Sequence, residues 1–141
     1  MISAKVKSIG PEAIAKQDRL AILFDETATP DLKKIAVVQE IEKDNDQQFN
    51  LKAGSQIVIG EQTYDVKFVG SLVNQNLQSI GHTTLVFKEV PEQPLASAIY
   101  LSPDVFPDFK VGETIQYKWL DGESWWNASL KYLGGERGLT S

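Results

Sequence analysis

The sequence predicts an all-β protein whose short strands form a closed or nearly closed barrel, or a sandwich. Apolar residues recur at every second position in short runs, which is the period of half-buried strands. Turn signals separate these runs roughly every 8 to 15 residues. Eight such runs occur in 141 residues, a length that can enclose one core without cross-links. Because open sheet edges promote aggregation, so many short strands favour a closed architecture.

The first half of the chain contains three expected strands, at residues 2–9, 20–24 and 35–41. Gly10 and Pro11 end the first strand, and Pro11 suits the first turn of a short helix that continues through Lys16. We expect residues 25–31 to form a loop. The third strand is rich in β-branched side chains, which favours a central position in the sheet. Residues 42–48 are charged and amide-rich and are expected to form a solvated loop.

The second half contains five more expected strands, at residues 56–59, 63–69, 83–87, 98–101 and 114–119. A tight turn at residues 60–62 joins the first two of these strands into a hairpin. Apolar residues in the segment 72–80 follow a helical spacing, which predicts a short helix with Ser71 as its N-cap. Gly81 is expected to end that helix in the left-handed conformation.

Residues 121–141 differ in character from residues 1–120, which we expect to form the barrel domain. The segment 123–133 has a helical pattern that two glycines end, and it contains the adjacent Trp125 and Trp126. Exposed neighbouring tryptophans are unfavourable in water. We therefore expect a helical tail that packs on the barrel or on a second copy of the chain.

Composition narrows the classes of function. The chain has no cysteine, so disulfides and thiolate chemistry are excluded, and its net charge of −5 offers no basic face for nucleic acid. No apolar run approaches the roughly 20 residues that span a bilayer, and the N-terminus lacks a secretion signal. His82 is the single histidine and cannot build a multi-histidine metal site. We expect a soluble, cytoplasmic protein without a metal or cofactor.

His82 is the candidate for chemistry. It follows Gly81 at the junction of the expected helix and the next strand. A histidine there can expose one ring nitrogen to a partner while the backbone orients the other, as a phosphoryl acceptor requires. Backbone N–H groups and the hydroxyls of Thr83 and Thr84 could hold the phosphoryl oxygens. On the residues alone, a structural histidine that caps the helix or satisfies a buried carbonyl is the commoner case.

The segment around His82 carries the pattern G-S-x-x-x-Q-N-L-x-x-x-G-H-x-T-L-x-F. Its fixed positions are Gly70, Ser71, Gln75, Asn76, Leu77, Gly81, His82, Thr84, Leu85 and Phe87. The pattern resembles the signature region of the glucitol/sorbitol-specific IIA components of the bacterial sugar phosphotransferase system, and the resemblance covers residues 1–119. It implies a compact Greek-key β-barrel. It also implies a relay in which a histidine accepts a phosphoryl group from the histidine-containing phosphocarrier protein and passes it to a IIB/IIC sugar permease. The candidates for the phosphoryl environment are Gly81, Thr83, Thr84 and Asn76.

One position departs from the family pattern. The resemblance implies a phosphorylated histidine on the strand at residues 35–41, at the position that Gln39 occupies here. An amide nitrogen has no lone pair that can attack phosphorus, so Gln39 cannot become a phosphohistidine. Either His82 accepts the phosphoryl group, or the chain is a degenerate paralogue that acts as a binding or regulatory module. The sequence leaves both readings open, together with a possible homodimer.

Three weaker patterns compete with this interpretation. The acidic residues at 40–46 could attract Ca²⁺, but they lack the glycine and spacing of an EF-hand, and a solvated loop explains them better. The tryptophans and tyrosines at 117–132 could stack a sugar or contact a partner, although core packing or a dimer contact explains them at least as well. A Ser-His-Asp triad would have to use His82, and no G-x-S-x-G elbow accompanies it.

Overall fold

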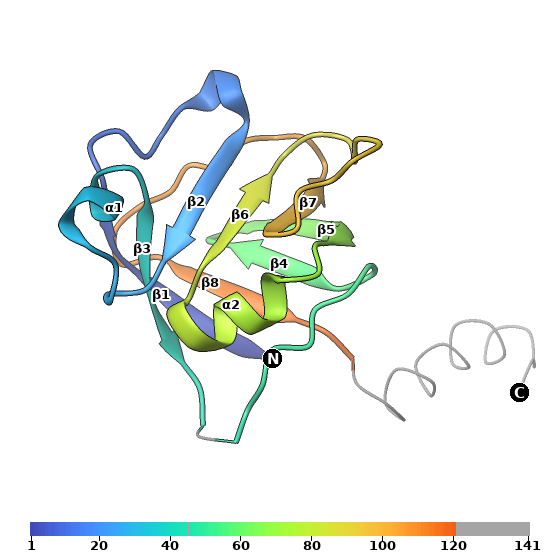
Figure 1. Ribbon diagram of the computed structural model, residues 1–141, viewed down its shortest axis with the longest axis horizontal. Helices are drawn as coiled ribbons and strands as arrows, with labels where there is room; N and C mark the ends of the chain where they lie inside the picture. The colour runs from blue at the N-terminus through green and yellow to red at the C-terminus, as the bar shows by residue number, and fades with distance from the viewer. Residues whose placement is uncertain (45, 121–141) are drawn as a thin grey trace, which may run out of the picture.

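The computed structural model describes residues 1–44 and 46–120. Eight strands in these residues close into one barrel, in the order β1-β3-β2-β6-β7-β5-β4-β8 (Figure 1). The closed barrel predicted from the sequence is confirmed. The strands are β1 (Ile2–Ile9), β2 (Leu20–Phe24), β3 (Val37–Glu42), β4 (Gln56–Ile59), β5 (Gln62–Val69), β6 (Thr83–Val86), β7 (Ala98–Ser102) and β8 (Thr114–Lys118).

Two of the strand pairs are parallel, β2 with β3 and β6 with β7, and the others are antiparallel. The register shifts in β1 between Val6 and Ser8 and in β5 between Val66 and Phe68. Such irregularities bend a strand and increase its twist, which a sheet needs in order to close on itself.

The barrel interior is filled by the alternate residues of each strand, as the period of two predicts. Tyr64, Tyr117 and Phe87 are the largest side chains with almost no exposed surface. One end of the barrel is closed by helix α2 (Val73–Ile80), which buries Val73 and Leu77 in the core. At another point of the core, Phe106 of the loop between β7 and β8 packs on Phe87, and Phe109 packs on Phe106.

A helix α1 (Pro30–Lys34) lies in the segment between β2 and β3, where the sequence led us to expect a loop followed by a strand from Ile35. The Thr29 side chain accepts a hydrogen bond from the Leu32 N–H, and Pro30 occupies the first turn. Both features are standard helix-start chemistry. The expectation was wrong at Ile35 and Ala36, because the third strand begins only at Val37.

The short helix expected from Pro11 to Lys16 is also wrong. Gly10 N–H donates to Ala36 O and Glu12 N–H donates to Lys34 O. This part of the chain is therefore held by main-chain hydrogen bonds to the segment before β3 and not by bonds within a helix. A helical turn forms only afterwards, as a 3₁₀ segment η1 (Lys16–Asp18).

Helix α2 agrees with the sequence except at its first residue. Leu72, not Ser71, is the N-cap, and no side chain caps the helix. Leu72 N–H donates to Ala96 O and Val73 N–H donates to Gly70 O, so main-chain carbonyls take the place of a side-chain cap. The predicted left-handed stop is confirmed, because Gly81 has φ +59°.

The expected tail helix and most of the aromatic cluster at 117–132 lie outside the described residues. Within the described residues, no helix is long and apolar enough to cross a membrane.

Candidate functional site

His82 lies at the junction of α2 and β6, on the outer face of the barrel. Its ring stacks on Phe24 of β2, with 4.2 Å between ring centroids and 17° between the planes. Phe24 faces outward because its neighbour Leu23 points into the core. Both Phe24 and His82 are half-buried. The imidazole therefore has one face covered by an aromatic ring and keeps part of its surface accessible.

The hydrogen bond of the ring identifies its tautomer. His82 Nδ1 lies 3.0 Å from the carbonyl oxygen of Leu23. A carbonyl oxygen only accepts, so Nδ1 carries the proton and donates. In a neutral ring the lone pair is then on Nε2. Among the described residues, Nε2 has no hydrogen-bond partner.

Gly81 brings two segments into close contact directly beside His82. A Cβ added to Gly81 would lie 2.7 Å from Cβ of Asp25 and 3.1 Å from its main-chain nitrogen. Asp25 N–H donates to Ile80 O at 3.0 Å, which holds the end of β2 against the end of α2. The glycine at this position is explained by its positive φ and by this contact.

Gln39 reaches the same junction from inside the barrel. Its side chain has no exposed surface, because it shares the inward face of β3 with Val37. Gln39 Nε2 donates to Gly81 O at 3.0 Å, and Gln39 Oε1 accepts from the Tyr117 hydroxyl at 2.7 Å. Burial raises the pKa of Tyr117, which keeps its hydroxyl protonated as a donor. The amide is thus satisfied on both sides, as a buried polar group requires.

Two side-chain amides on α2 fix the helix to the segment before β4. Asn74 accepts from Leu51 N–H at 2.8 Å and donates to Leu51 O at 3.0 Å. One turn later, Gln78 accepts from Phe49 N–H and donates to Gln47 O. The spacing of four residues places both amides on one face of the helix. These hydrogen bonds fix the position of α2, which directly precedes Gly81 and His82.

The family model for the glucitol/sorbitol-specific IIA component of the phosphotransferase system matches residues 1–116. The chain belongs to this family. Phosphoryl relay is the known role of the family. Two curated relatives are glucitol/sorbitol-specific EIIA components. The relative from Escherichia coli K12 is 29% identical over 114 residues, and that from Shigella flexneri is 28% identical; each match covers 80% of this chain and 90% of the relative.

The fold agrees with a solved IIA component. The crystal structure of a phosphotransferase system IIA component from Enterococcus faecalis V583 superposes with a TM-score of 0.77 at 38% identity. The match covers 83% of this chain and 99% of the other.

In this member of the IIA family, the residues predicted to surround a phosphoryl group do not all meet the His82 ring. Thr83 is fully buried on the opposite face of β6, and its hydroxyl donates to Ser97 O at 3.3 Å. Thr84 is half-buried, and its strand position places it on the same outer face as His82. Asn76 contributes its main-chain carbonyl, which accepts from the N–H groups of Gly81 and His82.

Sequence reasoning missed Phe24 and Tyr117 as members of this site. The alternation of β2 contained a signal for Phe24, since it puts Phe24 on the face opposite Leu23. Nothing local connects either residue to His82 or Gln39, because Tyr117 lies 78 positions from Gln39 along the chain.

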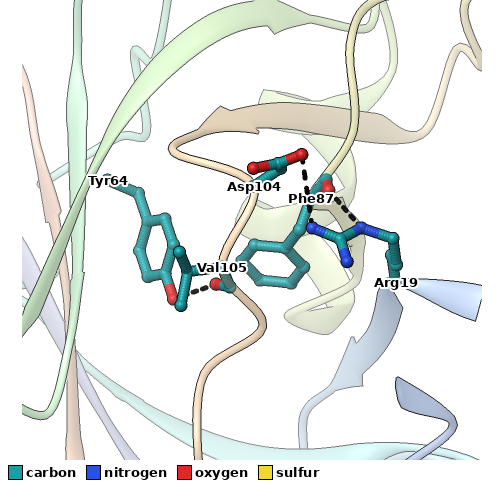
Figure 2. A network of polar contacts seen from close by, with 5 residues as sticks. All are labelled: Arg19, Tyr64, Phe87, Asp104 and Val105. Carbon is teal, nitrogen blue, oxygen red and sulfur yellow. Dashed lines mark hydrogen bonds and ion pairs between the residues drawn. The ribbon is translucent and has the colours of Figure 1, made fainter. Parts of the chain in front are cut away.

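A second polar network lies at the other end of β2 and β6 (Figure 2). Arg19 Nε donates to Phe87 O at 3.1 Å, and its guanidinium forms an ion pair with Asp104 at 3.4 Å. The Tyr64 hydroxyl donates to Val105 O at 2.6 Å. No cluster of three or more histidine, aspartate or glutamate side chains that could hold a metal ion occurs within residues 1–44 and 46–120.

Proposed function

We propose that this IIA component relays a phosphoryl group through Nε2 of His82. It would accept the group in the cytoplasm from the histidine-containing phosphocarrier protein and donate it to the IIB component of a IIB/IIC sugar permease. The observation that carries the proposal is the bond from His82 Nδ1 to Leu23 O. This bond leaves the lone pair on Nε2, on the outer face of the barrel.

The transfer is a displacement at phosphorus. The Nε2 lone pair forms the new N–P bond as the N–P bond of the donor's phosphohistidine breaks, and the donor ring nitrogen keeps that electron pair. Positive charge develops on the His82 imidazole when Nε2 is phosphorylated. The Leu23 carbonyl that accepts from Nδ1 and the face of Phe24 both stabilise this charge.

We infer different roles for the other candidates from their surroundings. The Thr84 hydroxyl shares the outer face with His82 and is the side-chain donor we expect nearest to a phosphoryl oxygen. Thr83 packs inside the barrel, and Gly81 and Asn76 position the main chain. Orientation of the acceptor is the main requirement, because phosphoryl transfer depends chiefly on positioning and electrostatics.

A second candidate function is a non-catalytic binding or regulatory module. Gln39 favours it, because a residue unable to accept a phosphoryl group occupies the family's usual phosphohistidine position. That position is also closed in this chain, since Gln39 has no exposed surface. A histidine placed there would lie inside the barrel, out of reach of a docking protein.

The test is a reconstituted assay with radiolabelled phosphoenolpyruvate, enzyme I and the phosphocarrier protein. Wild type is expected to take up acid-labile label, and His82→Asn is expected to take up none. Asparagine keeps an N–H near the position of Nδ1, which can donate to Leu23 O, but it has no counterpart of Nε2. Circular dichroism of the variant should match wild type, which separates lost chemistry from lost fold.

Gln39→His is the discriminating control. We expect its label to disappear in the double variant with His82→Asn, because position 39 is buried. An unlabelled wild type together with a labelled Gln39→His variant would eliminate His82 as the acceptor and establish the degenerate-paralogue reading.

A further inference from the structure

We propose that Gln39 and Tyr117 are positioning residues for His82, acting from inside the barrel on the peptide group that precedes the histidine. The proposal rests on the proposed function, because it concerns the orientation of the same acceptor. Neither residue contacts the expected phosphoryl group. Both act through the carbonyl of Gly81.

The peptide group between Gly81 and His82 is held on both sides. Its carbonyl accepts from Gln39 Nε2 at 3.0 Å, and its N–H donates to Asn76 O at 3.2 Å. Fixing this plane limits rotation of the chain directly before the His82 Cα. The ring is then aligned by two further contacts, with Leu23 O and with Phe24.

The Gly81 carbonyl determines which way the Gln39 amide points, and the Tyr117 hydroxyl holds the amide in that orientation. Gly81 O can only accept, so the amide nitrogen must face it, and the amide oxygen then faces the Tyr117 hydroxyl at 2.7 Å. Tyr117 and Gln39 have no exposed surface, so water cannot replace either partner without opening the core. The row Tyr117–Gln39–Gly81 thus links the barrel core to the outer face on which His82 lies.

Position 39 therefore needs one donor and one acceptor at once. Leucine offers neither, and an ionised glutamate would place a second acceptor against Gly81 O. A neutral imidazole has one donor and one acceptor, so histidine can satisfy both neighbours. Glutamine at this position serves the same hydrogen-bonding requirement without a nucleophilic nitrogen.

The experiment compares Gln39→Leu and Tyr117→Phe with the control Tyr64→Phe. Tyr64 is also fully buried and its hydroxyl also donates a hydrogen bond, but to Val105 O at the Arg19 end of β2 and β6. Two quantities are measured in the full-length protein. One is the rate of label transfer to His82, and the other is the pair of ¹⁵N chemical shifts of the His82 ring, which is unambiguous because the chain has one histidine.

In Gln39→Leu we expect the transfer rate to fall between about tenfold and 100-fold, since a small misplacement of a reacting group costs this much. The ring ¹⁵N shifts should move from a pure Nδ1–H tautomer toward an average of the two tautomers. Tyr117→Phe should lower the transfer rate by a smaller factor and move the ring shifts less, in the same direction. Tyr64→Phe should leave the transfer rate within about twofold of wild type and the ring shifts unchanged, even where it lowers the melting temperature.

Unchanged shifts and an unchanged rate in Tyr117→Phe and in folded Gln39→Leu would overturn the proposal and leave the pair a purely structural role. If Gln39→Leu fails to fold, Tyr117→Phe decides, because it removes only one oxygen. If wild type takes up no label, the proposed function fails, and the ring shifts still decide whether Gln39 and Tyr117 orient His82.

Discussion

The two ends of the β2–β6 strand pair are built alike and can do different chemistry. At one end the Phe24 and His82 side chains are stacked, and at the other Arg19 and Phe87 are joined by hydrogen bonds. At each end a nitrogen-bearing side chain donates to a main-chain carbonyl across the pair, Leu23 O for His82 and Phe87 O for Arg19. Each end also contains a residue with left-handed φ just before a strand: Gly81, at +59°, lies before His82 and β6, and Arg19, at +56°, lies directly before β2.

The difference lies in what remains after those bonds are made. The guanidinium of Arg19 is permanently charged, has no lone pair, and is already paired with Asp104. The His82 imidazole keeps a lone pair on Nε2 once Nδ1 has donated. Of the two ends, only the His82 end offers a nitrogen lone pair, which is what our proposal requires of a phosphoryl acceptor. At the Arg19 end, hydrogen bonds between Arg19 and Phe87 hold the start of β2 against the end of β6.

The largest effect we predict on stability comes from Gly81→Ala. Alanine would hold an unfavourable left-handed conformation and would push its Cβ against Asp25, 2.7 Å away. The combined cost is about 3 kcal/mol of unfolding free energy, measured by urea denaturation. Phosphoryl transfer should fall as well, because His82 follows this residue.

Gly112→Ala is the matched control for this substitution. Gly112 has φ +91°, but a Cβ there would meet nothing within 4 Å. It should cost about 1–2 kcal/mol through conformation alone. Equal losses at the two glycines would show that the contact with Asp25 is not tight.

The next effect is a loss of stability at alkaline pH that belongs to Tyr117. Burial raises the pKa of Tyr117 above its ordinary value of 10.0, so the folded protein keeps the proton that the unfolded chain releases. The stabilisation is complete below pH 10 and is lost as the pH rises toward the folded value. The slope from this one group approaches about 1.4 kcal/mol per pH unit.

Urea midpoints of wild type and Tyr117→Phe, measured between about pH 9 and pH 11, isolate this contribution. The variant should lose less stability than wild type over the interval. Burial also raises the pKa of Tyr64, with an opposing contribution from Gln62, and Tyr64→Phe should reduce the slope by less. Identical slopes in wild type and Tyr117→Phe would mean that the Tyr117 hydroxyl reaches solvent.

The sequence predicted the strands better than it predicted the site, for a physical reason. The alternation of apolar and polar residues is a local property. Together with β-branched content and turn signals, it located all eight strands. The pairing of β2 with β3 and of β6 with β7 in parallel depends on contacts between distant segments, which no local pattern contains. Helix α1 was missed although Thr29 and Pro30 are a helix-start signal, because the segment supplies no buried apolar face to reveal a helical period.

The same distinction applies to the functional residues. His82 could be chosen because it is the single histidine and lies in a recognisable segment. The period of β3 put Gln39 on the face of Val37, but its two partners lie 42 and 78 positions away in the sequence. Whether a buried amide finds a donor and an acceptor is decided by the closed barrel, so the role we propose for Gln39 had to come from the structure.

The smallest effect we predict is that of Arg19→Gly. This substitution tests whether the Arg19 end has only a structural role and no part in phosphoryl transfer. Glycine relieves the left-handed strain at φ +56°, which returns about 1 kcal/mol. It also removes the bond to Phe87 O and the ion pair with Asp104, which together are worth a similar amount, because the Asp104 side chain is 75% exposed. The urea midpoint should therefore stay near that of wild type, and label uptake at His82 should be unchanged. A tenfold loss of phosphoryl transfer with an unchanged midpoint would mean that the Arg19 end takes part in the relay, and that the two ends of β2 and β6 are coupled.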